Sequence, residues 1–135
     1  MCVKLRTSKM KPGDLFGFRT SGGPTAGKWG LFGGQQYNAR SERLDELYKE
    51  YRRGILFVDS FWEGGKEFKR TTGKDFAIGI IFNPQCEFAV LTCPANEIVK
   101  PYHHRMPLIL AENWSQSLEI PKLLSLDEFI LADAA

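Results

Sequence analysis

Phe76-Ala-Ile-Gly-Ile-Ile-Phe82 and Glu87-Phe-Ala-Val-Leu-Thr92 are two runs rich in apolar, β-branched and aromatic residues, and Asn83-Pro-Gln-Cys86 lies between them. Runs of this composition are typical of strands, whereas Asn and Pro favour a turn. The stretch therefore predicts two strands joined by a hairpin, and with it an antiparallel sheet.

The flanking segments predict further short strands and loops. Residues 9–34 are rich in Gly, Pro and Ser with scattered aromatic residues, a composition that disfavours helix. Residues 55–59 are a short apolar run that ends in an acid, and the polar, turn-rich residues 64–74 follow. Residues 108–110 predict another short strand.

Two segments predict helices. In residues 41–53, apolar side chains recur at positions i, i+3, i+4 and i+7 between charged ones, and Gly54 follows as a C-terminal stop. Ser125-Leu-Asp-Glu128 has the Ser-x-x-Glu form of a capping box and predicts a short last helix. Together the segments predict an α+β fold with a mostly antiparallel sheet and few helices.

Size and composition fit a single domain over residues 1–135. The chain is 43% hydrophobic and 13% aromatic, enough to bury one core. No stretch approaches the roughly 18 apolar residues of a membrane helix, and the N-terminus lacks the apolar run of a signal peptide. Cys2, Cys86 and Cys93 lack disulfide-framework spacing. We expect a cytoplasmic or otherwise intracellular protein with free thiols and no membrane partner.

Charge is unevenly distributed, although the formal net charge is only +2. Residues 1–40 carry seven Lys and Arg against one acid, residues 41–110 carry ten of each sign, and residues 111–135 carry one Lys against five acids. A basic N-terminal third is what a polyanion-binding face requires, and it is equally compatible with a solvated surface of mixed charge.

Two sets of residues partly match known patterns, one for phosphate binding and one for zinc binding, but each lacks a feature that its pattern requires. Residues 22–28 match the phosphate-binding pattern G-x-x-x-x-G-K, but Trp29 stands where the Mg²⁺-binding Ser or Thr belongs. Cys86 and Cys93 are seven residues apart and the two histidines are adjacent, unlike the usual spacings of zinc ligands. We therefore expect neither nucleotide hydrolysis nor a metal site.

Four short motifs remain, and each has an ordinary explanation when taken alone. They are Met1-Cys2, Asn38-Ala-Arg-Ser-Glu42, Asp59-Ser-Phe-Trp-Glu63 and His103-His-Arg-Met-Pro107. The Cys is explained as an arbitrary residue at a chain end and the Asn as part of a helix cap. The final Glu of the third motif is explained as a surface acid, and the first His of the fourth as a structural residue. Their order along the chain is more specific than any one of them.

In this order the motifs resemble those of the SRAP family, the SOS-response-associated peptidase-like proteins that crosslink to abasic sites in single-stranded DNA. Members begin Met-Cys, carry a Trp-Gly segment before Asn-Ala-Arg and a downstream Glu, close an aromatic-rich strand end on Glu, and later show His-x-Arg-Met-Pro. The similarity extends from Met1 to about Leu110. It implies an open-barrel-like sheet, catalytic residues Cys2, Asn38, Glu63 and His103, and DNA-contacting residues Lys4, Trp29, Arg40 and Arg105.

The chain departs from the family pattern at positions that concern DNA binding more than chemistry. It is considerably shorter than usual members, with little between Cys2 and Trp29. Lys4 stands where the family has Arg, which keeps a positive charge but loses a bidentate phosphate donor. Gly64 follows Glu63 where the family generally has Trp. For Trp29, a place in the core is the preferred interpretation and base stacking the alternative.

The implied chemistry needs a cysteine at the N-terminus. An abasic deoxyribose equilibrates with an open-chain aldehyde, which condenses with an amine to a Schiff base, and a thiol on the adjacent carbon closes a thiazolidine ring. After removal of Met1, Cys2 has its amine and thiol in that relation. Glu63 and His103 are the candidates for proton transfer, and Asn38 for orienting the amine or the sugar. The two arginines are the candidates for the flanking phosphates.

Two other functions remain open at the level of sequence. One is a thiol peptidase in which Cys2, His103 and Asn38 act as nucleophile, base and orienting residue. The other is a noncatalytic binder of single-stranded DNA that uses basic and aromatic side chains. For the crosslinking function, we expect a monomer whose partner is single-stranded DNA with an abasic site, and no cofactor.

Overall fold

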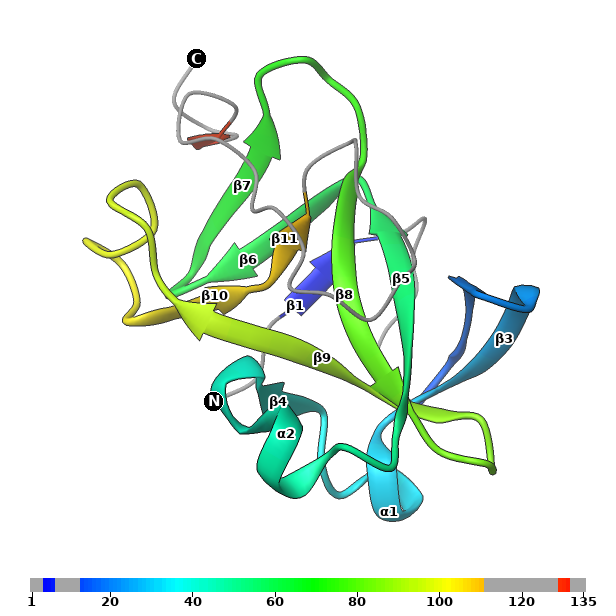
Figure 1. The fold of residues 1–135 in the computed structure, drawn as a ribbon. Coiled ribbons are helices and arrows are strands. Elements are labelled where there is room, and N and C mark those ends of the chain that lie inside the picture. Colours follow the sequence, from blue (N-terminus) through cyan, green and yellow to red (C-terminus); the bar gives the residue numbers. More distant parts are fainter. Residues whose placement is uncertain (1–3, 7–12, 111–128, 132–135) are drawn as a thin grey trace.

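The computed structural model describes residues 4–6, 13–110 and 129–131, and strands dominate these residues (Figure 1). The larger sheet contains β2 (Leu15–Thr20), β3 (Gly23–Trp29), β4 (Asn38–Arg40), β5 (Arg52–Val58), β8 (Phe76–Phe82), β9 (Glu87–Pro94), β10 (Arg105–Pro107) and β11 (Ile109–Leu110). The smaller sheet has the order β1-β6-β7-β12, with β1 (Lys4–Arg6), β6 (Ser60–Glu63), β7 (Lys66–Arg70) and β12 (Phe129–Leu131). Short helical segments are α1 (Leu31–Gly34), the 3-10 turn η1 (Ser41–Arg43) and α2 (Leu44–Leu47).

Strand β9 is the centre of the larger sheet because it pairs along both edges. On one edge it pairs antiparallel with β8 and β10, for example Ile80 with Val90. On the other it pairs in parallel with β3 and β4, so that Val90 also lies opposite Asn38. The β8–β9 pairing closes the path β9-β3-β2-β5-β8 into a partial ring. The predicted α+β class with a mostly antiparallel, open-barrel-like sheet is confirmed.

The predicted hairpin is confirmed as β8 and β9. Both strands are buried along most of their length, which explains why their apolar residues are continuous rather than alternating. At the turn, Oδ1 of Asn83 accepts hydrogen bonds from the backbone N–H groups of Gln85 at 3.1 Å and Glu87 at 2.9 Å. The Asn83 side chain thereby provides an acceptor for two backbone N–H groups at the turn.

Aromatic rings from β2, β3 and β9 pack together in the core. The Phe16 ring meets Trp29 edge to face with 6.0 Å between centroids, and Phe88 in the same way at 5.7 Å. Trp29 is 1% exposed, and its Nε1 donates a hydrogen bond to the Tyr37 carbonyl at 2.9 Å. Trp29 is therefore a core residue, and its ring has no face open to a DNA base.

The helix predicted over residues 41–53 is wrong in its second half. The helical segment ends at Leu47, and β5 begins at Arg52, where it pairs with Phe82 of β8. Most of the side chains with helical spacing still pack against the core: Leu44, Tyr48 and Tyr51. An isolated helix this short is marginal in water, so strand pairing by β5 determines where it ends.

Other segments agree with the sequence in part. β2 and β3 confirm short strands within residues 9–34, and β11 confirms the strand near residue 109. Residues 64–74 were expected to be turn-rich, but they contain β7, whose Phe68 stacks on Phe61 of β6 with 5.2 Å between ring centroids. The helix predicted at residues 125–128 lies outside the described residues. Within the described ranges, no helix has the length and apolarity needed to cross a membrane.

Candidate functional site

Glu63 is a buried carboxyl at the end of β6. Side chains alternate along a strand, so Glu63 faces the same side as Phe61, which is fully buried. Glu63 itself is 3% exposed, which rules out the surface acid that was its ordinary explanation. Burial raises the pKa of Glu63 from its ordinary value of 4.5 to about 7, and the nearby His103 limits that rise. A carboxyl group with this pKa can take and return a proton near neutral pH.

His103 lies beside Glu63, with 3.8 Å between its Nδ1 and Oε1 of Glu63. Its backbone N–H donates to the Val99 carbonyl at 3.0 Å, which holds the loop that precedes β10. The same Nδ1 lies 3.1 Å from the backbone nitrogen of Arg105 and 3.0 Å from the Arg105 carbonyl oxygen. The other ring nitrogen, Nε2, is buried and has no hydrogen-bond partner in the described part of the chain.

These contacts define two protonation states of the pair. When Nδ1 of His103 is unprotonated, it accepts a hydrogen bond from the Arg105 N–H, and Glu63 can hold the proton. When Nδ1 is protonated, it donates to the Arg105 carbonyl and faces the Glu63 carboxylate. Nδ1 is therefore the ring nitrogen that faces Glu63, and the direction of its hydrogen bond with Arg105 depends on the tautomer of His103.

A close backbone contact between Gly64 and Tyr102 sets the separation of Glu63 and His103. Gly64 has a φ of +57°, and a Cβ at this position would lie 2.2 Å from the Tyr102 carbonyl oxygen. A residue with a side chain cannot approach this closely, and glycine also accepts the left-handed conformation of the turn into β7. Glu63 and His103 are the sequence neighbours of this contact, so it brings the acid and the imidazole together.

Asn38 and Arg40 are carried by β4, on the edge of β9 opposite β10. Thr92 of β9 lies between the two strands, because it pairs with Arg40 on one side and with Pro107 on the other. Oδ1 of Asn38 is buried, whereas Arg40 is exposed. Arg40 occupies the N-cap position of η1 and forms no side-chain cap, so a helix cap does not explain the Asn38 motif.

Arg105 is paired within the protein. Its Nη1 and Nη2 donate to the two carboxylate oxygens of Glu42 at 2.5 and 2.8 Å, and Nη2 also donates to Oγ1 of Thr92 at 2.9 Å. The hydrogen bonds from Arg105 lower the pKa of Glu42 to about 2, and the pKa of Arg105 is raised in turn. Any anion that binds Arg105 through both Nη atoms must therefore displace Glu42. In the sequence, the only signal for Glu42 was its place shortly after Asn-Ala-Arg in the second motif.

The remaining predicted residues are Cys2 and Lys4. Cys2 lies outside the described residues, and Lys4 begins β1, where it pairs with Trp62 of β6. Among the other cysteines, Cys93 is buried, and burial raises the pKa of its thiol to about 11. The Cys93 thiol is therefore protonated at neutral pH and is a poor nucleophile.

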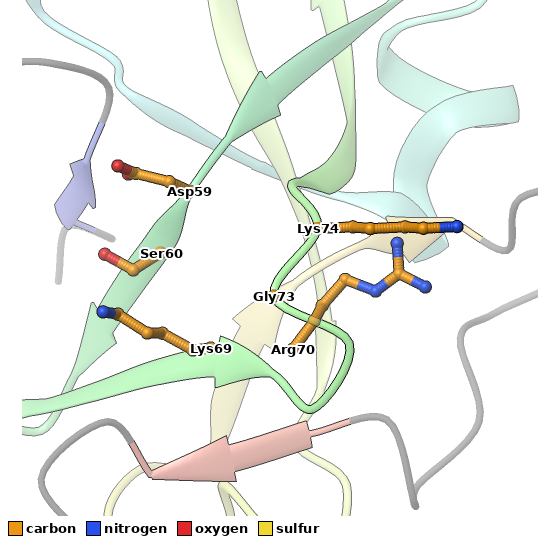
Figure 2. A pocket seen from close by; sticks show the side chains of 6 residues that line it. All are labelled: Asp59, Ser60, Lys69, Arg70, Gly73 and Lys74. Carbon is orange, nitrogen blue, oxygen red and sulfur yellow. The ribbon is translucent and has the colours of Figure 1, made fainter.

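A separate pocket of about 440 Å³ lies between the start of β6 and the turn from β7 to β8 (Figure 2). Its lining residues are Asp59, Ser60, Lys69, Arg70, Gly73 and Lys74. Figure 2 shows the side chains of Arg70 and Lys74 extending to one side and that of Lys69 to the other. Because these cations do not converge on one point and the pocket contains no predicted site residue, Glu63 and His103 form the stronger candidate site.

Comparison with known proteins gives the fold alone. No protein-family model and no curated protein matches the sequence. A crystal structure of a protein from Bordetella bronchiseptica has a TM-score of 0.71 and 20% sequence identity, over 90% of this chain and 84% of that chain. One from Bacteroides thetaiotaomicron has a TM-score of 0.70 and 17% identity, over 88% of this chain and 73% of that chain. At such identities the likeness shows a shared fold and says nothing of function.

We predict that Gly64→Ala destabilises the protein more than Gly65→Ala. Both glycines have positive φ, so each substitution costs about 1–2 kcal/mol for the left-handed backbone. A Cβ at Gly64 also meets the Tyr102 carbonyl, which adds roughly 1–3 kcal/mol of overpacking, whereas nothing lies within 4 Å of a Cβ at Gly65. Urea unfolding measures the free energies, and equal losses for both variants contradict the role given to the Gly64 contact.

We predict that Glu63→Gln stabilises the protein above pH 7 but not below about pH 4. In the unfolded chain Glu63 ionises near its ordinary pKa of 4.5, whereas in the folded protein it keeps its proton to about pH 7. Between these values the folded state binds more protons, so wild-type stability falls as the pH rises. The full difference is up to about 3 kcal/mol, at 1.36 kcal/mol per pKa unit. Urea unfolding from pH 4 to 8 measures it, and a pH-independent difference between the two proteins contradicts the raised pKa.

Proposed function

We propose that this protein captures the aldehyde of an abasic site in single-stranded DNA by a covalent bond to Cys2. The observation that carries the proposal is the pairing of β1 with β6, the strand that ends at Glu63. Lys4 lies opposite Trp62, and covalent geometry keeps the Cα of Cys2 within about 7 Å of the Cα of Lys4. The pairing therefore holds β1, which begins two residues after Cys2 in the sequence, against the strand that ends at the buried acid.

The capture consists of two additions and one loss of water. With Met1 removed, the α-amine of Cys2 adds to the aldehyde carbon, and loss of water leaves an imine. The thiolate then adds to the imine carbon, the nitrogen takes a proton, and a thiazolidine ring closes. An α-amine has an unperturbed pKa of about 7.7 to 8.0, so an appreciable fraction is nucleophilic near neutrality.

Glu63 and His103 suit the proton transfers of this sequence. Addition of the amine releases a proton, and loss of water requires one at the departing hydroxyl group. Protonated Glu63 is an acid of the right strength, and its Oε1 lies 3.8 Å from Nδ1 of His103, so a bridging water or the substrate carries a proton between them. The group beside Nδ1 of His103 is thus a carboxyl, which favours proton exchange over the Asn-oriented base of a thiol peptidase.

The basic N-terminal third of the chain supplies charge for the DNA backbone. Arg40 and Arg105 lie at strand ends on opposite edges of β9 and are the proposed contacts for the DNA backbone. Arg40 is exposed. At Arg105, a phosphate replaces the Glu42 carboxylate, since both are anions that a guanidinium can bind through two parallel hydrogen bonds.

We predict that Cys2→Ser abolishes a heat-stable adduct with a single-stranded oligonucleotide that contains one abasic site. The variant keeps its amine, so a Schiff base that borohydride can trap remains, but serine does not close the thiazolidine. Intact-mass measurement identifies each product and shows whether Met1 has been removed. Cys86→Ser, which removes a different partly accessible thiol, is expected to retain the full yield.

Two results contradict this assignment. One is an undiminished stable adduct with Cys2→Ser, and the other is an undiminished adduct when the measured mass includes Met1. Wild-type protein that binds the strand without any covalent product supports the noncatalytic binder instead.

We further predict that Glu63→Gln and His103→Ala slow adduct formation by about 10²- to 10⁴-fold, the usual effect of removing one positioned acid or base. Final yield changes less, because the two groups lower barriers in both directions rather than the energy of the product. His104→Ala is the matched control, since this neighbouring imidazole is exposed. Time courses of crosslinking and of transfer to a competitor strand give both rates, and wild-type rates in both variants mean that the two residues are structural.

A further inference from the structure

We propose that Tyr102 and Lys66 form the nucleotide-contacting edge of this site, where the Tyr102 ring stacks on the base next to the abasic sugar and Lys66 binds its phosphate. This inference rests on the proposed function, because it gives that site a substrate with a base beside the reacting sugar. It assigns a position to the neighbouring nucleotide, which Glu63 and His103 by themselves do not.

The backbone fixes Tyr102 relative to the acid and the imidazole. Tyr102 immediately precedes His103, and its N–H donates to the Val99 carbonyl at 2.8 Å. Its carbonyl packs against Gly64, the residue after Glu63. The ring is supported from beneath by buried Phe68, with 5.9 Å between centroids and 64° between planes. Two contacts thus hold the Tyr102 backbone between Gly64 and His103, and a third positions the ring on Phe68.

The Tyr102 ring is also exposed to solvent and lies beside the ammonium group of Lys66. Tyr102 is 37% exposed, although its neighbours on the core side are buried. Nζ of Lys66 lies 5.9 Å from the ring centroid. Lys66 belongs to the same turn as the buried acid, since it pairs with Glu63 across the β6–β7 hairpin. An aromatic face and an ammonium group therefore sit together at the edge of the proton-transfer pair.

Proteins commonly bind single-stranded nucleic acid with an aromatic ring and a basic side chain side by side. Bases stack on aromatic side chains regardless of sequence, while lysine and arginine follow the phosphates. An exposed cation–π contact is weaker than base stacking, so an incoming base displaces the Lys66 ammonium from the ring. Lys66 is exposed, and its long side chain lets the ammonium move to the phosphate of the same nucleotide.

Binding of a nonreactive strand tests the platform separately from the chemistry. The probe is a fluorescent oligonucleotide with one tetrahydrofuran abasic analogue, which has no aldehyde, flanked by adenines. A second probe carries tetrahydrofuran at the flanking positions too, so that no neighbouring base is present. Anisotropy gives both dissociation constants for wild type, Tyr102→Ala, Tyr102→Phe and Lys66→Ala.

Wild type is expected to bind the adenine-flanked probe roughly 5- to 50-fold more tightly than the probe without flanking bases. Tyr102→Ala loses this preference, and Tyr102→Phe keeps it because it keeps the ring. Lys66→Ala weakens both probes alike and flattens the plot of log affinity against log salt by roughly 0.7. Phe57→Ala is the matched control, because Phe57 is also an exposed ring beneath a cation, Arg19, but lies on β5.

The inference is overturned if Tyr102→Ala keeps the wild-type preference, if Phe57→Ala loses it equally, or if wild type binds neither probe. A folded Tyr102→Phe that behaves like Tyr102→Ala overturns it as well, since the ring alone is then insufficient. The two proposals fail separately. Tyr102-dependent binding without any adduct on a true abasic site refutes the crosslinking chemistry alone, and a normal adduct without Tyr102-dependent binding refutes the platform alone.

Discussion

Pairing on both edges of β9 is the constraint on which the rest of the molecule depends. β3 and β4 bring the N-terminal third to one edge, while β8 and β10 bring the central hairpin and the His103 motif to the other. Neighbouring strands lie about 4.8 Å apart, so β4 and β10 are separated by only about 10 Å at Thr92. Motifs that are more than sixty residues apart in sequence therefore meet at one end of a single strand.

Two glutamates near that end have opposite environments. Glu63 is buried with an imidazole as its ionisable neighbour, and its pKa is about 7. Glu42 is partly exposed and held by the Arg105 guanidinium, and its pKa is about 2. Two carboxyl groups with pKa values this far apart are in different protonation states near neutral pH. Glu63 is able to exchange protons near neutral pH, whereas Glu42 is ionised there and is hydrogen-bonded to the Arg105 guanidinium.

The loop that carries His103 is held by hydrogen bonds within the protein. Oδ1 of Asn96 accepts hydrogen bonds from the backbone N–H groups of Ile98 at 3.1 Å and Val99 at 3.0 Å, and the Val99 carbonyl in turn accepts the His103 N–H. The Ala95 N–H donates to the His104 carbonyl at 3.0 Å and closes the base of the loop. These hydrogen bonds fix the position of the His103 backbone, which the proposed proton transfer requires.

The sequence by itself determined the β8–β9 hairpin and the α+β class, and the resemblance of its motifs pointed to Glu63 and His103, which the structure places side by side. Local signals were sufficient for the hairpin, because apolar strand residues flank a turn whose Asn side chain bonds its own backbone. They failed at the end of α2, where pairing of β5 with β8 ends the helix early. They also failed at β7, a polar segment that forms a strand because it pairs with β6. Only the tertiary structure decided that Glu63 is buried beside His103 and that Arg105 is held by Glu42. For Trp29, it confirmed the core position that the sequence favoured. Burial and proton affinity are set by residues brought from other segments, and spacing along one chain does not specify them.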